Sequence, residues 1–308
     1  MQLLVEKERQ SRYCDCNSPP QLIDISEYHP LELSRSTTPI MFIEPPPQWA
    51  TQYLRSRLQI PDFDYADLHH ILQSAADIMF EDRGRAEQAL TTTVFREWLL
   101  SPESAKLLIH GDFGVTNKVS PFTVLCATVL QVFRVTAGYI GLAFFCGLHL
   151  QGDEIQGPSV MIRSLVTQLL RQYPRQAIDP DAAIDLDAVA ERSIEHLCEL
   201  FVFLVRQLPP TVTVFCVVDG VNEYEDEDYF DELDQVIVAL LNLMDGENRS
   251  GARIKLLLAS PQPTTIVRQI FDDEPGILLH MQSVPLVEEA VPTSPLRERL
   301  LSDNRHQS

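Results

Sequence analysis

Val212-Thr-Val-Phe-Cys-Val-Val-Asp219-Gly-Val-Asn-Glu223 is the stretch that decides the fold. Its unbroken run of β-branched and aromatic residues is typical of a strand buried on both faces, as in a parallel sheet that helices cover. The run ends at Asp219, and Glu223 follows four residues later. An acid at the carboxyl end of such a strand can hold Mg²⁺, and a nearby glutamate can polarise an attacking water. A buried strand that exits into an acidic loop would show the same pattern.

Short apolar runs alternate with helical patterns on either side of this stretch. The runs predict strands at 107–110, 140–146, 212–219, 254–260 and 277–281. The patterns between them predict helices at about 122–133, 161–172, 189–207 and 230–244. Strands that alternate with helices imply a three-layer α/β fold, here with a parallel sheet of about five strands and helices on both faces.

The flanking segments differ in composition from this α/β domain, which we place at 105–284. Helical spacing of apolar residues at 68–79 and 86–99 predicts a helical lead-in over 49–104. Residues 1–48 are rich in Ser, Thr and Pro, and such a segment cannot bury enough apolar surface to offset its ordering entropy. We therefore expect a disordered arm there and a disordered tail at 285–308.

The bulk composition excludes several classes of protein. A formal net charge of −20 over 308 residues argues against nucleic-acid binding and against docking on an anionic membrane. The chain has no apolar run near the ~18 residues of a membrane helix, and charges occupy the place of a signal-peptide core. We expect a cytoplasmic protein, with a nuclear location as the alternative. Cys14 and Cys16 form a C-x-C pair, but no second ligand cluster accompanies them.

A glycine loop, Gly111-Asp-Phe-Gly114-Val-Thr-Asn-Lys118, follows the first predicted strand, and the fourth ends at Ser260. With Asp219 on the third, this order resembles the ASCE branch of P-loop NTPases. More narrowly, residues 90–282 resemble the NACHT-type STAND domains of fungal nephrocystin-like signalling proteins. The resemblance is carried by the following segments: Phe95-Arg-Glu-Trp98-Leu, Leu108-Ile-His-Gly111-Asp-Phe-Gly114, Leu142-Ala-Phe-Phe-Cys146, Ile162-Arg-Ser-Leu-Val-Thr-Gln-Leu-Leu170, Val217-Val-Asp-Gly-Val-Asn-Glu223 and Leu257-Leu-Ala-Ser260.

The phosphate-binding part of that pattern is altered. The P-loop needs a glycine for close backbone approach, a lysine for the β/γ phosphates and a hydroxyl for magnesium. Counted from Gly111, these places hold Thr116, Asn117 and Lys118. The resemblance also implies an arginine after Ser260, where the chain has Pro-Gln-Pro. The acids are retained, with Asp219 as a vestigial Mg²⁺ ligand and Glu223 as the catalytic residue of an active enzyme.

These departures predict a pseudo-NTPase: a regulatory or protein-interaction protein without catalysis and with no cofactor expected. The vestigial nucleotide contacts are Gly111, Gly114, Thr116, Asn117, Lys118 and Ser260. One alternative is a weak ATP- or GTP-binding STAND NTPase that uses Mg²⁺, Asp219 and Lys118 in a rearranged loop. Another is a fragment that pairs with longer relatives through the helices around 68–99. The resemblance implies further helical, winged-helix and repeat regions, which we do not expect in the residues after 282; a truncated gene would give the same sequence.

Overall fold

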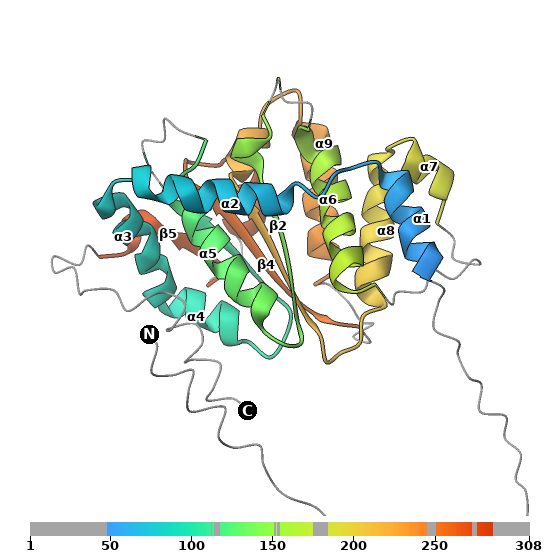
Figure 1. Ribbon diagram of the computed structural model, residues 1–308. Coiled ribbons are helices and arrows are strands. Elements are labelled where there is room, and N and C mark those ends of the chain that lie inside the picture. The colour runs from blue at the N-terminus through green and yellow to red at the C-terminus, as the bar shows by residue number, and fades with distance from the viewer. Residues whose placement is uncertain are drawn as a thin grey trace, which may run out of the picture. The chain divides into compact units, whose positions relative to one another are not determined.

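A five-stranded, entirely parallel sheet forms the middle layer of the protein (Figure 1). The structure, a computed structural model, describes residues 48–111, 113, 118–150, 152, 155–174, 184–244, 251–272 and 276–285. The strand order is β2-β3-β4-β1-β5. The strands are β1 (Ala105–His110), β2 (Tyr139–Phe145), β3 (Thr213–Asp219), β4 (Arg253–Ser260) and β5 (Leu278–His280). The predicted α/β fold with about five parallel strands is confirmed.

Helices precede the sheet and connect its strands. The lead-in contains α1 (Gln48–Leu58), α2 (Asp64–Ser74), α3 (Phe80–Gln88) and α4 (Thr93–Leu100). The connections contain α5 (Pro121–Val135), α6 (Gly157–Gln172), α7 (Leu186–Ala190), α8 (Ile194–Arg206), α9 (Phe230–Asn242) and α10 (Ile266–Asp272). The predicted arm at 1–48 and tail at 285–308 lie outside the described residues, except for positions 48 and 285.

The helix predicted at 189–207 is wrong in one respect, because the structure has two helices there. α7 ends at Ala190 and α8 begins at Ile194. Between them Arg192 has a φ of 66°, which a right-handed helix does not allow. The Asp185 side chain accepts hydrogen bonds from the N–H groups of Asp187 and Ala188 and fixes the start of α7.

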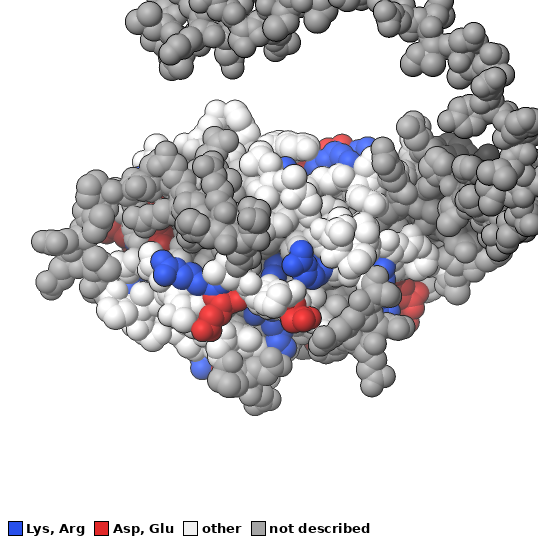
Figure 2. Space-filling view, turned by 90° about the horizontal axis from the view of Figure 1, so that it is seen from below, with Lys and Arg blue, Asp and Glu red and all other residues white. Residues whose placement is uncertain are grey.

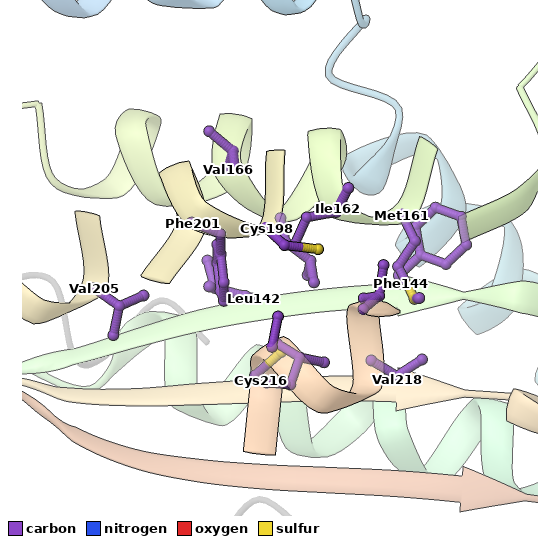
Figure 3. Close-up of a cluster of buried hydrophobic side chains, with 14 of the residues drawn as sticks. Leu142, Phe144, Met161, Ile162, Val166, Cys198, Phe201, Val205, Cys216 and Val218 are labelled. Atoms are coloured by element: carbon purple, nitrogen blue, oxygen red, sulfur yellow. The ribbon is translucent and has the colours of Figure 1, made fainter. Parts of the chain in front are cut away.

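Two apolar cores lie on the two faces of the sheet. Alternation along β3 sends Val214, Cys216 and Val218 to one face and Phe215 and Val217 to the other. The first face is covered by α6, α8, α9 and α10, and the second by α2, α3, α4 and α5. Figure 3 shows how side chains of α6 and α8 meet those of β2 and β3 in the first core. By the same alternation, Asp219 belongs to the face that α5 covers.

The lead-in helices pack against the domain through their apolar sides. Ile71 of α2 and Phe95 and Trp98 of α4 are buried in the second core. The Trp98 indole N–H contacts the carbonyls of Ala105 and Leu256, both at 3.1 Å. Asp64 of α2 is buried and bonds to Arg134 of α5 and Arg171 of α6, each at 2.6 Å. The apolar pattern of the lead-in is therefore used within the protein itself.

The outer edge of β2 is closed by two glutamines of α6. The Gln168 amide accepts from the Ala143 N–H (3.0 Å) and donates to the Ala143 carbonyl (2.7 Å). Gln172 makes the same pair of bonds with Gly141, at 3.0 and 2.8 Å. The two side chains take the place of a neighbouring strand, so this edge does not offer an open ladder for pairing. Within the described residues, no helix is long and apolar enough to cross a membrane.

Candidate functional site

The carboxyl ends of β1, β3 and β4 lie side by side at one edge of the sheet. β1 leads into α5 on one face, whereas its neighbour β4 leads into α10 on the other face. In open α/β sheets, ligands bind where neighbouring strands diverge in this way. The Gly111 N–H donates to the Ser260 carbonyl (2.9 Å), and the Gly220 N–H donates to the Ala259 carbonyl (2.8 Å). The glycine loop and the acidic loop are therefore both tied to the end of β4.

Asp219 is the buried acid of this edge, with 2 % of its surface exposed. Its Oδ2 accepts a hydrogen bond of 2.6 Å from the Thr123 hydroxyl, at the start of α5. Its Oδ1 is also buried and meets no hydrogen-bond donor among the described residues. A carboxylate that is half satisfied in this way is costly to keep ionised.

The pKa of Asp219 is raised from 3.8 to about 7. Burial is the main cause, and the nearby Glu223 carboxylate raises the pKa further. The hydrogen bonds from Thr123 and from the Gly220 N–H act in the opposite direction. Near neutral pH the site therefore holds a carboxyl that changes between its neutral and ionised forms. The same acids raise the pKa of the buried Cys146 thiol above its usual value, after the larger effect of burial.

The N-terminus of α5 is closed by its own residues. The Ser120 hydroxyl accepts from the Thr123 N–H, and the Thr123 hydroxyl oxygen accepts from the Ser120 N–H, both at 3.0 Å. This is a reciprocal capping box. Pro121, the first helical residue, has no N–H group. The first turn therefore offers an outside anion fewer donors than a helix start usually does.

Two aromatic rings fill the space beside Gly111. Phe113 and Phe122 form an edge-to-face pair with ring centroids 5.0 Å apart. A Cβ atom added to Gly111 would lie 2.8 Å from the Phe113 ring and 2.9 Å from the Phe122 ring. Phe122 is fully buried. The glycine is thus required for close approach of side chains of the protein itself.

Lys118 is exposed and lies just before the capping box. Its carbonyl oxygen would be 2.8 Å from a Cβ on Gly147, the residue after Cys146. Gly147 in turn lies against Gly220, which has a φ of 74°. Glycine backbone therefore lies at the point where three segments meet. These segments are the turn after β2, the turn after β3 and the segment that leads into α5.

Ser260 and Glu223 meet through Asn222. The fully buried Ser260 hydroxyl contacts Asn222 Oδ1 at 3.0 Å and also contacts the Gln262 carbonyl. The Asn222 amide donates to Glu223 Oε1 at 3.0 Å. Both ends of this short network are thus engaged by groups of the protein.

Glu225 occupies the N-terminus of α10. Its carboxylate accepts from the N–H groups of Thr265 (2.9 Å), Ile266 (3.1 Å) and Val267 (2.7 Å). The Thr264 hydroxyl contacts the same carboxylate. A carboxylate at this place satisfies unpaired donors and the positive end of the helix dipole. One acid of the acidic loop therefore has a structural role.

The structure places five of the predicted site residues at this edge. They are Gly111, Lys118, Asp219, Glu223 and Ser260, whereas Gly114, Thr116 and Asn117 lie outside the described residues. Sequence reasoning missed Thr123, although Ser120-Pro-Phe-Thr123 carries the signal of a helix start. It also missed the use of Glu225 as a cap, for which the sequence has no local signal. The described residues contain no group of three or more His, Cys, Asp and Glu that could hold a metal ion.

A comparison with protein families gives the affiliation of the chain. The family model described as Nephrocystin 3, N-terminal matches residues 84–260. The match runs from α3 to the last residue of β4 and covers more than half of the 308 residues. No curated protein matches the chain. The matched segment contains the glycine loop, Asp219, Glu223 and Ser260, which are the features of the edge described above. The chain therefore belongs to the nephrocystin 3 N-terminal family.

Proposed function

We propose that this protein is a catalytically inactive, NACHT-like pseudo-NTPase that acts as a regulatory or protein-interaction domain. The observation that carries the proposal is the hydrogen bond between Thr123 and Asp219. In a working P-loop NTPase, the hydroxyl of the G-K-[ST] sequence and the acid of the third strand share one magnesium ion. Thr123 is the hydroxyl residue that stands beside Asp219 here.

This contact changes the register of the motif. With Thr123 in the hydroxyl place, the lysine place falls on Phe122 and the glycine place on Pro121. The count from Gly111 put Thr116, Asn117 and Lys118 in these places. In both registers the phosphate-binding lysine is replaced, but the second puts a fully buried aromatic ring there. Such a ring offers no charge to a triphosphate, because it belongs to the apolar core.

The residues between β4 and α10, and the acid that caps α10, support the same proposal. No arginine follows Ser260, and the segment Pro261-Gln262-Pro263 stands in its place. Glu225 puts a carboxylate at the start of α10, on the same edge of the sheet. Acids that lack a compensating cation repel a polyphosphate. The loss of two charge-assisted contacts, at about 1.5–3 kcal/mol each, lowers affinity by two or more orders of magnitude.

The alternative is a weak nucleotide-binding protein, and one observation favours it. Asp219 Oδ1 has no donor among the described residues, and the Thr123 oxygen lies beside the same carboxylate. Two oxygen ligands suit Mg²⁺, and a bound cation would hold Asp219 in its ionised form. The exposed Lys118 would then supply the charge for phosphate. In this case Lys118 and Asp219 would both be required for binding.

Two measurements distinguish the pseudo-NTPase from the weak nucleotide-binding protein. They are calorimetric titration of the full chain with ATP or GTP and Mg²⁺, and an assay of phosphate release. We expect no saturable binding heat at millimolar nucleotide. We also expect the parent protein to release phosphate no faster than the Asp219→Ala variant does. Micromolar binding with turnover that Asp219→Ala abolishes would overturn the proposal. Lys118→Ala should remove any binding under the alternative. Lys106→Ala, a lysine at the opposite end of β1, is the matched control.

Restoring the motif in each register sharpens this test. Thr116→Gly with Pro121→Gly and Phe122→Lys follows the Thr123 register, whereas Thr116→Gly with Asn117→Lys and Lys118→Ser follows the count from Gly111. We expect a gain of nucleotide binding only from the first set, with circular dichroism as the check of folding. Removal of the buried Phe122 ring costs about 3–5 kcal/mol, so the first variant can fail to fold. A gain from the second set would then still contradict the Thr123 register.

The charge distribution supports protein partners rather than nucleic acid or a membrane. On the described part of the face shown in Figure 2, basic and acidic side chains lie side by side. They do not gather into the single basic patch that binding to phosphate backbones requires. The net charge of −20 agrees with this. We place the protein in the cytoplasm as part of the same proposal.

A further inference from the structure

Two histidines face each other at the carboxyl ends of neighbouring strands. The last residue of β1, His110, is directly paired in register with the last residue of β5, His280. Their Nδ1 atoms are 3.2 Å apart, and their ring centroids are 5.2 Å apart. His110 is 8 % exposed, and His280 is partly buried. The pair therefore lies at the carboxyl edge of the sheet, where His110 directly precedes Gly111, and on the face opposite to that of Asp219.

The fold itself creates this pairing. Side chains of residues directly paired across parallel strands point to the same face of the sheet. Leu108 belongs to the core on the α10 side, so His110, two residues on, points to that side as well. His280 shares this side because Leu279 belongs to the opposite core. The Ser283 hydroxyl donates to the His280 carbonyl at 2.7 Å and fixes the chain beyond β5.

The spacing of the two rings fits a shared cation. A tetrahedral zinc ion with Zn–N bonds of about 2.0–2.1 Å holds two nitrogen ligands about 3.3 Å apart. With that bond length and the size of an imidazole ring, the centroids of two such ligands lie about 5.2 Å apart. In the metal-free protein the two Nδ1 atoms, 3.2 Å apart, are within hydrogen-bond distance and share one proton, and the ring centroids are 5.2 Å apart; a cation bound between the rings would take the place of that proton with little change in either separation.

We propose that His110 and His280 bind a divalent transition-metal ion of the Zn²⁺ class through their Nδ1 atoms. Neutral imidazole is a preferred ligand of such ions, and two rings on rigid, directly paired strands are already positioned for it. Water completes the coordination, because the described residues place no third His, Cys, Asp or Glu in a metal-binding group. The ion joins the three-residue edge strand β5 to β1 and fixes the strand end from which the glycine loop leaves.

The test is a calorimetric titration of the metal-free full chain with Zn²⁺ near neutral pH, where imidazole is available as a ligand. The background carries Cys14→Ser and Cys16→Ser, because this thiol pair would compete for zinc. We expect one saturable site whose affinity falls at least tenfold in His280→Ala and in His110→Ala. His196→Ala, which replaces a partly exposed histidine of α8, should leave the affinity unchanged.

A second readout keeps the test valid if His110→Ala fails to fold. X-ray absorption of the zinc-loaded protein should show two imidazole ligands at about 2.0–2.1 Å, with one lost in His280→Ala. The melting temperature should rise with zinc in the parent protein and not in His280→Ala. Unchanged affinity in His280→Ala, or no saturable binding in the parent protein, would overturn the proposal. Neither result depends on nucleotide binding, so the two proposals can fail separately.

Discussion

The N-termini of α5 and α10 lie at the same edge of the sheet, and they are closed in different ways. α5 is closed by neutral groups of its own first turn, Ser120 and Thr123, with Pro121 as the first helical residue. α10 is closed by the charged carboxylate of Glu225, which comes from a loop 40 residues earlier. Helix N-termini are the usual anion sites of such folds. In this protein both are occupied by groups of the chain, which is the physical basis of the proposed loss of nucleotide binding.

The largest effect should come from breaking the charged cap. Glu225→Ala leaves the N–H groups of Thr265, Ile266 and Val267 without their acceptor, and we expect a loss of about 2–3 kcal/mol in the free energy of unfolding. Urea unfolding measures it. Glu227→Ala, an exposed acid of the same loop, should change stability by less than about 0.5 kcal/mol. Equal effects of the two substitutions would show that the cap has no special role.

A somewhat smaller effect on the free energy of unfolding should follow from ionisation of Asp219, the acid that Thr123 contacts, as the pH rises. The pKa of Asp219 is about 7 in the folded state against 3.8 in the unfolded chain, so between these values the folded state holds a proton that the unfolded state releases. Stability due to this group is therefore lost as pH rises, by about 2 kcal/mol between about pH 5.5 and 8. Unfolding in urea across this range should show the decrease. Asp219→Asn should remove this part of the dependence, and an unchanged pH profile would contradict the assignment.

The smallest effect should come from the neutral cap. Ser120→Ala removes the acceptor of the Thr123 N–H, and loss of such a cap costs about 1 kcal/mol. Thermal unfolding measures the change, and Ser120→Thr should recover most of it. The variant also tests the comparison directly, because it opens the first turn of α5. If ATP then bound, the capping box alone would be the obstacle, and the buried Phe122 would not matter.

The sequence predicts the framework of this protein because its signals are local. Runs such as 212–219 and 254–260 lie close to the observed strands, since burial on both faces requires continuous apolar residues. The alternation of these runs with helical patterns is enough to predict a parallel sheet. The break at Arg192 escaped prediction because apolar spacing continues across it. The candidate site was predicted in part, as Asp219, Ser260 and Gly111 all lie at the carboxyl edge of one sheet.

What the sequence alone determined is the α/β layering, the buried third strand and the acid at its end, all of which follow from periodicity within a few residues. Only the tertiary structure decided which side chains meet across that edge. Thr123 and Asp219 are 96 residues apart, and His110 and His280 are 170 apart. Such contacts depend on the strand order β2-β3-β4-β1-β5 and on its register. Local propensity does not encode either, because both are set by how the two cores pack on the faces of the sheet.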